Sequence, residues 1–336
     1  FFLNSLESDD PLTRLYAWEN IGYLVSKGIV TPEEVKERSY YFLELLESKY
    51  VVRIRKRAWQ HVHRLIDQGW VTPDEVKERK RYFLDLLEYK GEYDRSIAWA
   101  RVVSLIDKGL ITRGDVWRRK HFFLGLLESG DESVRLDAWR HVNELIGKGL
   151  ITRDVWRRKH FFLELLESSN SFTRFDAWRH VPELVKKGVI SIDEVKERKR
   201  FLFELLESPD RDVRLRIWDS YWIENLINEG IITPEEVRQE RQYLLELLKS
   251  EDEHIRDLAR GEVNGFISMG LITRDDSGFF LSLLEAYDKN VRSEAWSHVD
   301  DLIEKNIVTA DEVKERKRFL FELLESPDRD VESRAW

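Results

Sequence analysis

The sequence predicts an all-α fold, an α-solenoid of about eight stacked antiparallel helix pairs with a period of about 40 residues. Three observations predict it: a recurring tryptophan, a helix-start motif in each unit, and a glycine that ends each second helix. In such folds each unit contacts only its neighbours along the chain, so no single central core is needed. The tryptophan anchors are Trp18, Trp59, Trp99, Trp139, Trp178, Trp218, Trp296 and Trp336.

The first helix of each unit begins at a capping box. Residues 31–34 read Thr-Pro-Glu-Glu, with threonine as the N-cap, proline at the first helical position and glutamate as the reciprocal capping partner. From this box the apolar residues predict one helix of roughly 15 residues, which ends near Ser48. The box recurs, with or without its proline, at Thr72, Ser191, Thr233 and Thr309.

The second helix of each unit carries the tryptophan on an apolar stripe of helical period, so the anchor is expected to lie in the core. In the fifth unit Pro182 is expected to interrupt this helix, because proline lacks the N–H that continues the hydrogen-bonding pattern. Asn306 ends the last complete second helix. The others end at a glycine, the usual left-handed C-cap: Gly28, Gly69, Gly109, Gly149, Gly188, Gly230 and Gly270.

The segment 205–214, Leu-Leu-Glu-Ser-Pro-Asp-Arg-Asp-Val-Arg, resembles the core of a HEAT repeat, and the resemblance covers nearly the whole chain. An Asp lies eight residues before most anchors and an Arg four before, although Val51, Gly91 and Glu332 break these columns. The resemblance implies a right-handed α-solenoid in which these columns are structural. Large tryptophans stand where HEAT units usually carry a small residue. The Arg column is Arg14, Arg55, Arg95, Arg135, Arg174, Arg214, Arg256 and Arg292.

Residues 1–336 are interpreted as one HEAT-like solenoid with irregular units at about 209–285. There the expected tryptophan is replaced by Arg260, the same second helix contains Gly261 and Gly265, and the following first helix lacks about four residues. These departures indicate either drift in a tolerant scaffold or a partner site. The repeats at both ends look incomplete, so we expect further repeats or another subunit to cover them.

Composition narrows the class of protein. Cysteine is absent, which excludes disulfides and cysteine-ligated metals, and no apolar stretch reaches the length of a membrane span. No phosphate loop, zinc-protease or nucleophile-elbow motif occurs, so we expect no catalytic residue, no cofactor and no metal site. Charged residues make up 35% of the chain and methionine occurs once, a pattern that favours a cytoplasmic protein of a thermophilic prokaryote.

A basic region at 113–160 is the most distinctive candidate site. It holds 11 Lys and Arg against seven Asp and Glu, in a chain of net charge −9. Stacking would bring two basic segments side by side, each preceded by a tryptophan where most other units carry Lys or Arg. The alternative is a solvated helix face. The candidate partner-binding residues are Trp117, Arg118, Arg119, Lys120, Trp156, Arg157, Arg158 and Lys159.

Three functions are compatible with these patterns. The first is a non-enzymatic scaffold or adaptor that binds a protein partner on the solenoid surface. The second is a nucleic-acid-associated solenoid that binds the RNA or DNA backbone through the region 113–160. The third follows from the resemblance alone, because some HEAT-like proteins are DNA glycosylases and others are bilin lyases. No residue here stands out as a catalytic group of that kind, so the first is favoured.

Overall fold

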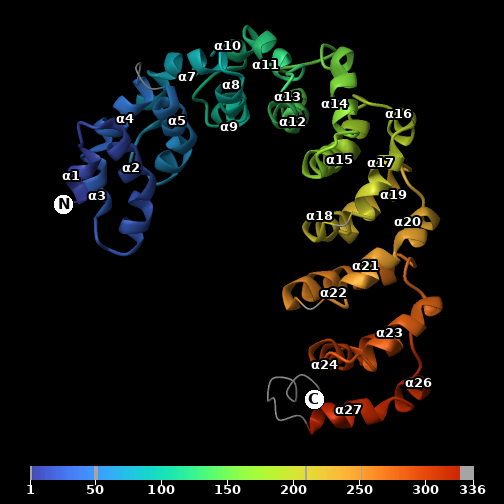
Figure 1. Cartoon of the computed structure of the whole chain (residues 1–336). Helices are drawn as coiled ribbons and strands as arrows, with labels where there is room; N and C mark the ends of the chain where they lie inside the picture. The colour runs from blue at the N-terminus through green and yellow to red at the C-terminus, as the bar shows by residue number, and fades with distance from the viewer. Residues whose placement is uncertain (1, 49–51, 209, 251, 326–336) are drawn as a thin grey trace. The chain divides into compact units, whose positions relative to one another are not determined.

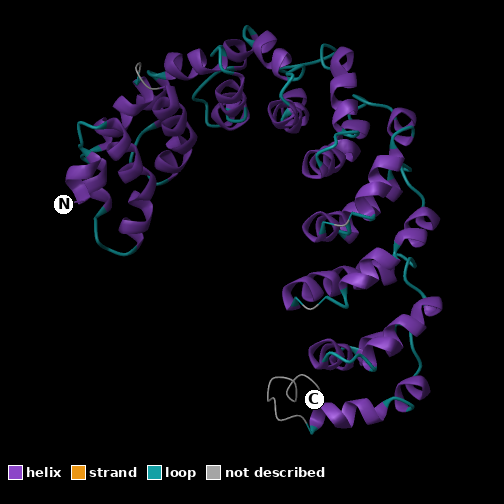
Figure 2. Ribbon diagram, in the orientation of Figure 1, coloured by secondary structure: helices purple, strands orange, loops and turns teal. Residues whose placement is uncertain are grey.

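The computed structural model describes residues 2–48, 52–208, 210–250 and 252–325. In these ranges helices alternate with loops and turns, and no strand occurs (Figure 2). The chain divides into two compact units, Phe1–Leu165 and Leu166–Trp336. None of the described helices is both long and apolar enough to cross a membrane. The predicted features at Val51, Glu332 and Trp336 lie outside the described residues.

The N-terminal unit contains the tryptophan-bearing helices α2, α5, α8 and α12, and each of these packs against the next. This contact between consecutive second helices is the basis of the repeat. The elements are α1 (Phe2–Leu6), α2 (Pro11–Ser26), α3 (Pro32–Lys36), α4 (Ser39–Glu47), α5 (Val52–Asp67), α6 (Pro73–Lys77), α7 (Lys80–Leu87), α8 (Glu92–Trp99), α9 (Val102–Asp107), α10 (Arg113–Trp117), α11 (Lys120–Leu126), α12 (Glu132–Arg140), α13 (Val142–Gly147), the 3₁₀ helix η1 (Trp156–Arg158) and α14 (Lys159–Leu165).

The C-terminal unit repeats the pattern, and its paired helices lie side by side, as α21 and α22 or α23 and α24 show (Figure 1). Its elements are α15 (Ser171–Lys186), α16 (Ile192–Lys196), α17 (Lys199–Leu206), α18 (Arg211–Ile217), α19 (Ser220–Asn228), α20 (Pro234–Glu240), α21 (Gln242–Leu247), α22 (Glu253–Ser268), the 3₁₀ helix η2 (Arg274–Asp276), α23 (Ser277–Leu284), α24 (Lys289–Ser297), α25 (Val299–Glu304), α26 (Ala310–Lys314) and α27 (Lys317–Leu324).

The predicted helix ends are confirmed. In the first box the Thr31 side chain accepts from the Glu34 backbone N–H, and the Glu34 carboxylate accepts from the Thr31 backbone N–H. Every predicted C-cap residue has a positive φ, from 66° to 72° at the glycines and 58° at Asn306. Only glycine and a few polar residues adopt this conformation readily, so the spacing of these residues sets where each second helix stops.

The expected continuous first helix is wrong: it breaks one turn after the capping box, as between α3 and α4. The Arg38 backbone N–H bonds to the carbonyl of Val35, three residues back, which tightens the turn. The Arg38 guanidinium then donates to the Glu34 carbonyl at 2.8 Å, which satisfies an oxygen that the break would otherwise leave free. Arginines at the same place make the same bond at Arg79, Arg119, Arg158, Arg198 and Arg316.

The predicted core position of the tryptophans is confirmed, and each has a second role. The Trp139 side chain is fully buried and its indole N–H donates to the carbonyl of Leu127, at the end of the first helix of the same pair. Its ring also packs against Phe162, with 5.2 Å between centroids. The indole therefore ties its own pair together and contacts the next. The same N–H bond is made by Trp18, Trp59, Trp99, Trp178, Trp218 and Trp296.

The Asp column caps the second helices: the Asp131 side chain accepts from the backbone N–H groups of Ser133 and Val134. The Arg column is largely buried and bonds the turn before its own helix. Arg135, for example, donates to the carbonyl of Ser129 at 3.0 Å. These columns are structural in the described units, as their regular occurrence predicts.

Of the irregularities expected in the second helices, one does not occur and one has a packing explanation. The expected interruption at Pro182 is wrong, because α15 runs unbroken from Ser171 to Lys186. Gly265 in α22 is explained by a close approach: a Cβ at this position would lie 2.5 Å from the Cβ of Ser220, at the start of α19. Helix α22 can lie this close to α19 only because residue 265 has no side chain.

Candidate functional site

Several predicted site residues are already engaged within the N-terminal unit. The Arg119 Nε atom lies 2.5 Å from a carboxylate oxygen of Glu88, in the preceding repeat, and the same guanidinium donates to the Asp115 carbonyl. Arg158 pairs in the same way with Glu128. We call this series of contacts the Arg–Glu ladder: Arg38–Glu7, Arg79–Glu47, Arg119–Glu88, Arg158–Glu128, Arg198–Glu167 and Arg316–Glu285.

The lysine that follows the ladder arginine binds a carboxylate just before the next first helix. The Lys120 Nζ atom lies 2.7 Å from the Asp154 carboxylate, and its cation lies 4.9 Å from the Trp117 ring centroid. The Lys120 hydrogen bond is the main cause that lowers the pKa of Asp154. Lys159 is partly buried at the position equivalent to Lys120. The basic segments are thus largely neutralised by the protein itself.

The remaining predicted residues are exposed. Trp117 is 54% exposed and Trp156 is 36% exposed, although both are large apolar side chains. Arg118 and Arg157 follow them and are also exposed, and neither forms an ion pair with another described residue. A shallow depression holds Trp117 and Arg118 beside Gly149 and Leu150 of the next repeat. The structure therefore separates two exposed Trp-Arg pairs from the ladder residues that the sequence grouped with them.

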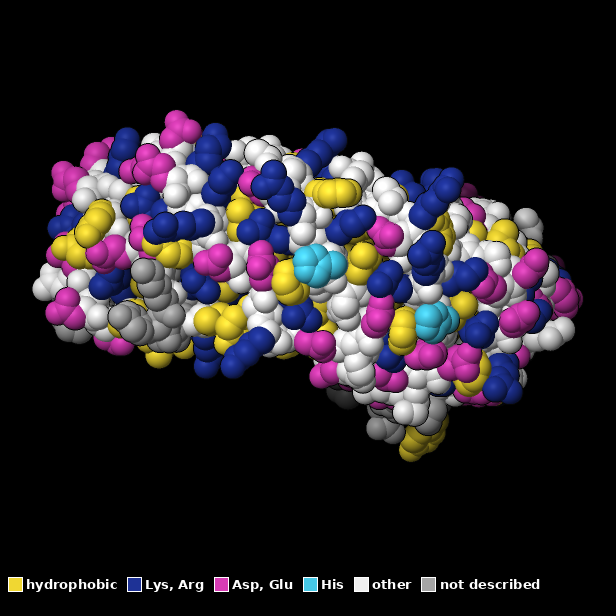
Figure 3. All heavy atoms as spheres, turned by 90° about the horizontal axis from the view of Figure 1, so that it is seen from above, with side chains coloured by type: hydrophobic (Ala, Val, Ile, Leu, Met, Phe, Trp, Pro, Cys, Tyr) yellow, Lys and Arg dark blue, Asp and Glu magenta, His cyan; other side chains and the backbone are white. Residues whose placement is uncertain are grey.

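One face of the molecule is mixed in charge. In the view from above the molecule, Lys and Arg side chains alternate with Asp and Glu and with hydrophobic side chains (Figure 3). This arrangement differs from the continuous basic surface that typically tracks a nucleic-acid backbone. Among the described residues, no three His, Asp or Glu side chains come together as a metal site.

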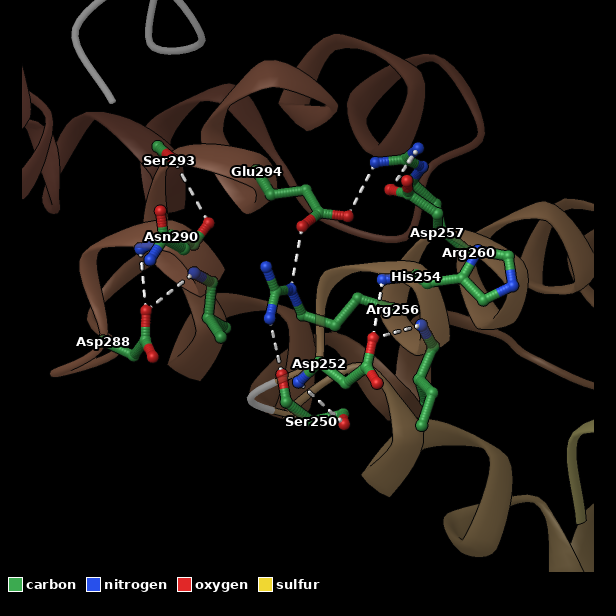
Figure 4. A network of polar contacts seen from close by, with 12 residues as sticks. Ser250, Asp252, His254, Arg256, Asp257, Arg260, Asp288, Asn290, Ser293 and Glu294 are labelled. Atoms are coloured by element: carbon green, nitrogen blue, oxygen red, sulfur yellow. Dashed lines mark hydrogen bonds and ion pairs between the residues drawn. The ribbon is translucent and has the colours of Figure 1, made fainter. Parts of the chain in front are cut away.

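A second group of polar residues, outside the predicted candidate site, surrounds Arg260 in the C-terminal unit. The Arg260 guanidinium lies 2.7 Å from one oxygen of Glu294 and 3.0 Å from Asp257. The other Glu294 oxygen lies 2.9 Å from the Nε atom of Arg256, whose guanidinium also donates to the carbonyl of Ser250 (Figure 4). Arg256 is only 3% exposed, so Glu294 balances a buried cation.

A cavity adjoins this cluster. It is lined by apolar side chains, including Val263 and Phe280, together with Arg260 and His298. Burial is the main cause that lowers the pKa of His298, and the nearby Arg260 charge acts in the same direction. The loss of the tryptophan at position 260 was the sequence signal for this site. The partner Glu294, 34 residues later, could not be assigned from it.

Comparison with known proteins supports the fold and does not identify a family. No family model matches the chain, and no curated protein matches it. A chain of the full-length AP-3 complex in an intermediate open conformation, itself a homology model, is similar over 90% of this chain. The identity is 15% and the TM-score 0.50, and this chain spans 50% of that one. An engineered protein is similar over 99% of this chain and 86% of its own, with 18% identity and a TM-score of 0.39.

Similarity at these identities concerns the fold alone. The likeness to the AP-3 chain and the helical structure agree with each other. The chain is an all-α protein with a helical-repeat fold.

Proposed function

We propose that the protein is a non-enzymatic scaffold that binds a protein partner through its helical repeats. In this proposal about eight HEAT-like helix pairs stack as a right-handed α-solenoid. The likeness to a chain of the AP-3 complex supports such a role, because that chain belongs to an assembly of several proteins. The order of the contacts also supports it, because each second helix from α2 to α12, and from α15 to α22, packs on the next.

The observation that carries the proposal is the pair of exposed Trp-Arg dipeptides on consecutive repeats. Trp117 and Arg118 begin one copy of the site, and Trp156 and Arg157 begin the next. Tryptophan and arginine are the side chains most enriched at the centres of protein interfaces. Here they are exposed, while the charges beside them are paired within the protein. A mixed apolar and cationic surface of this kind favours an acidic protein surface over a phosphate backbone.

The test compares partner capture by the native chain and by a Trp117→Ala/Trp156→Ala variant, with nuclease present. The proposal predicts that a captured protein is lost with the variant. A Lys36→Ala/Lys77→Ala variant is the control, since these residues hold the equivalent positions in earlier repeats. If the tryptophan variant captures the same proteins as the native chain, this surface is not the binding site.

Nucleic-acid binding is the competing outcome. It would appear as RNA or DNA affinity that falls steeply with salt and is lost in an Arg118→Glu/Arg157→Glu variant. Arg119 and Arg158 should be left unchanged, because glutamate there would face Glu88 or Glu128 and weaken the fold. The charge reversal of Arg118 and Arg157 leaves the ladder intact.

A further inference from the structure

The cavity beside Arg260 lies in the C-terminal unit, between α22 and the second helix of the next repeat, α24 with α25. About 80 Å³ of it is accessible to a water-sized molecule, and it is partly open to solvent. Its lining resembles that of small-molecule sites, which are mostly apolar with a few polar groups that set the ligand's orientation. The lining includes Leu248, Val263, Phe280, Val291 and Leu302.

The other repeats show what normally fills this position. In the fourth unit the Trp139 indole donates its N–H to the carbonyl of Leu127, twelve residues earlier, at 3.2 Å. Its ring packs 5.2 Å from Phe162 of the next first helix. Trp99 does the same with the Leu87 carbonyl and with Phe123, at 5.1 Å. An indole, an acceptor carbonyl and a phenylalanine ring therefore form a recurring set.

In the seventh unit, where Arg260 replaces the tryptophan, the carbonyl and the phenylalanine of this set remain without an indole. Leu248 lies twelve residues before Arg260, and Phe280 occupies the phenylalanine position of the next first helix. Both line the cavity. Within the part of the chain that the structure describes, no group donates to the Leu248 carbonyl. A carbonyl without a donor beside an apolar cavity is unfavourable, so a donor brought by a ligand would stabilise the site.

The Arg260 side chain does not replace the indole. Its guanidinium extends to Glu294 and Asp257, and the side chain is 36% exposed, whereas Trp139 is fully buried (Figure 4). The guanidinium thus lies at the rim of the cavity rather than against the Leu248 carbonyl. A cation in this position attracts the face of an aromatic ring.

We infer that this cavity is a binding site for an indole ring carried by a small molecule. The ring would lie against Phe280 and donate its N–H to the Leu248 carbonyl, with the Arg260 guanidinium at the open side. The ligand would complete the set that the first four units form with Trp18, Trp59, Trp99 and Trp139. This inference does not depend on the scaffold proposal, since the Trp-Arg pairs lie in the N-terminal unit.

The test titrates the full chain with free indole and follows binding by calorimetry and by NMR. We expect saturable binding at one site, with transferred magnetisation between indole protons and the side chains of Leu248 and Phe280. Benzothiophene has nearly the same shape and lacks the N–H. It should bind about tenfold more weakly, the effect of one hydrogen bond to a buried acceptor. Equal affinity of the two would overturn the assigned carbonyl contact.

Two variants separate filling of the cavity from loss of charge. Arg260→Trp supplies the missing ring and should abolish indole binding, whereas Arg260→Gln keeps the cavity and should retain it within a few-fold. Persistent binding in a folded Arg260→Trp protein overturns the inference. If Arg260→Trp does not fold, the inference is tested by NMR in the native chain, and the absence of contacts from indole to Leu248 and Phe280 overturns it. Absence of saturable binding up to the solubility limit of indole overturns it too.

The source of the ring is settled by a second ligand. N-acetyl-tryptophanamide carries the same indole on a peptide backbone. If it competes with indole and binds at least as tightly, the natural occupant is a tryptophan side chain and the assignment to a small molecule is wrong. If it binds more weakly than indole, the small-molecule assignment stands.

Discussion

Gly265→Ala should destabilise the C-terminal unit, although alanine is the better helix former. The added Cβ would lie 2.5 Å from the Cβ of Ser220, about 1 Å short of the normal separation between packed carbons. Helices α19 and α22 would have to move apart, and overpacking of this kind costs about 1–3 kcal/mol. The helix propensity gained by alanine, about 1 kcal/mol, offsets only part of that.

The matched control is Gly261→Ala, four residues earlier in the same helix. No atom lies within 4 Å of the Cβ that this change would add. Alanine there should stabilise the protein by about 1 kcal/mol, because only the backbone entropy of the unfolded chain changes. The two substitutions are chemically identical, so the opposite signs would come from packing alone.

Thermal and urea unfolding of both variants measure the effect. A net loss of up to about 2 kcal/mol in Gly265→Ala corresponds to a fall in Tm of up to about 8 °C for a unit of this size. Adding Ser220→Gly should remove most of the loss, which a double-mutant cycle detects. Stabilisation of Gly265→Ala equal to that of Gly261→Ala would refute the close approach of α19 and α22.

Three further predictions concern single contacts. Glu240 replaces the ladder arginine and lies near Glu207. Burial, and secondly the negative charge of Glu207, raise the pKa of Glu240. The protonated form of Glu240 therefore stabilises the fold at low pH, and this stabilisation is lost as the pH rises through its pKa. Urea unfolding should therefore show that Glu240→Gln is more stable than the native chain near pH 7 but not near pH 3. The same difference in unfolding free energy at both pH values would contradict this prediction. An Arg274 hydrogen bond lowers the pKa of Glu312 to about 2, and Arg274→Gln should return it toward the ordinary value in an NMR titration. Trp139→Phe should cost about 2–3 kcal/mol in urea unfolding, because the carbonyl that accepts the indole N–H loses its donor; a loss below 1 kcal/mol would show that the bond contributes little.

Helix ends could be predicted from the sequence because they depend on local chemistry. Thr31 and Glu34 are three residues apart, and Gly28 acts through its own φ. The break after each capping box was missed because the pattern of apolar residues continues through it. What determines the break is the guanidinium of a residue such as Arg38, whose side chain replaces the missing backbone hydrogen bond.

The candidate site could be predicted only in part, because ion pairs between repeats join residues about 30 apart in sequence. The composition of the basic region gave no indication that Arg119 pairs with Glu88 while Arg118 stays exposed. A glutamate near the end of most first helices, such as Glu88 and Glu128, was a usable signal for the ladder. The cavity could not be predicted from the sequence, because it depends on the direction of the Arg260 side chain, which extends to Glu294.

The substitution at Glu240 also affects how the repeats unfold. In a linear array, stability is the sum of the intrinsic stability of each repeat and a coupling between nearest neighbours. Each rung of the Arg–Glu ladder adds to that coupling, and at Glu240 the rung is replaced by two carboxylates. The cooperative unfolding unit should therefore end at this junction. Amide hydrogen exchange would then show two blocks with different protection, before and after residue 240, in place of one all-or-none transition.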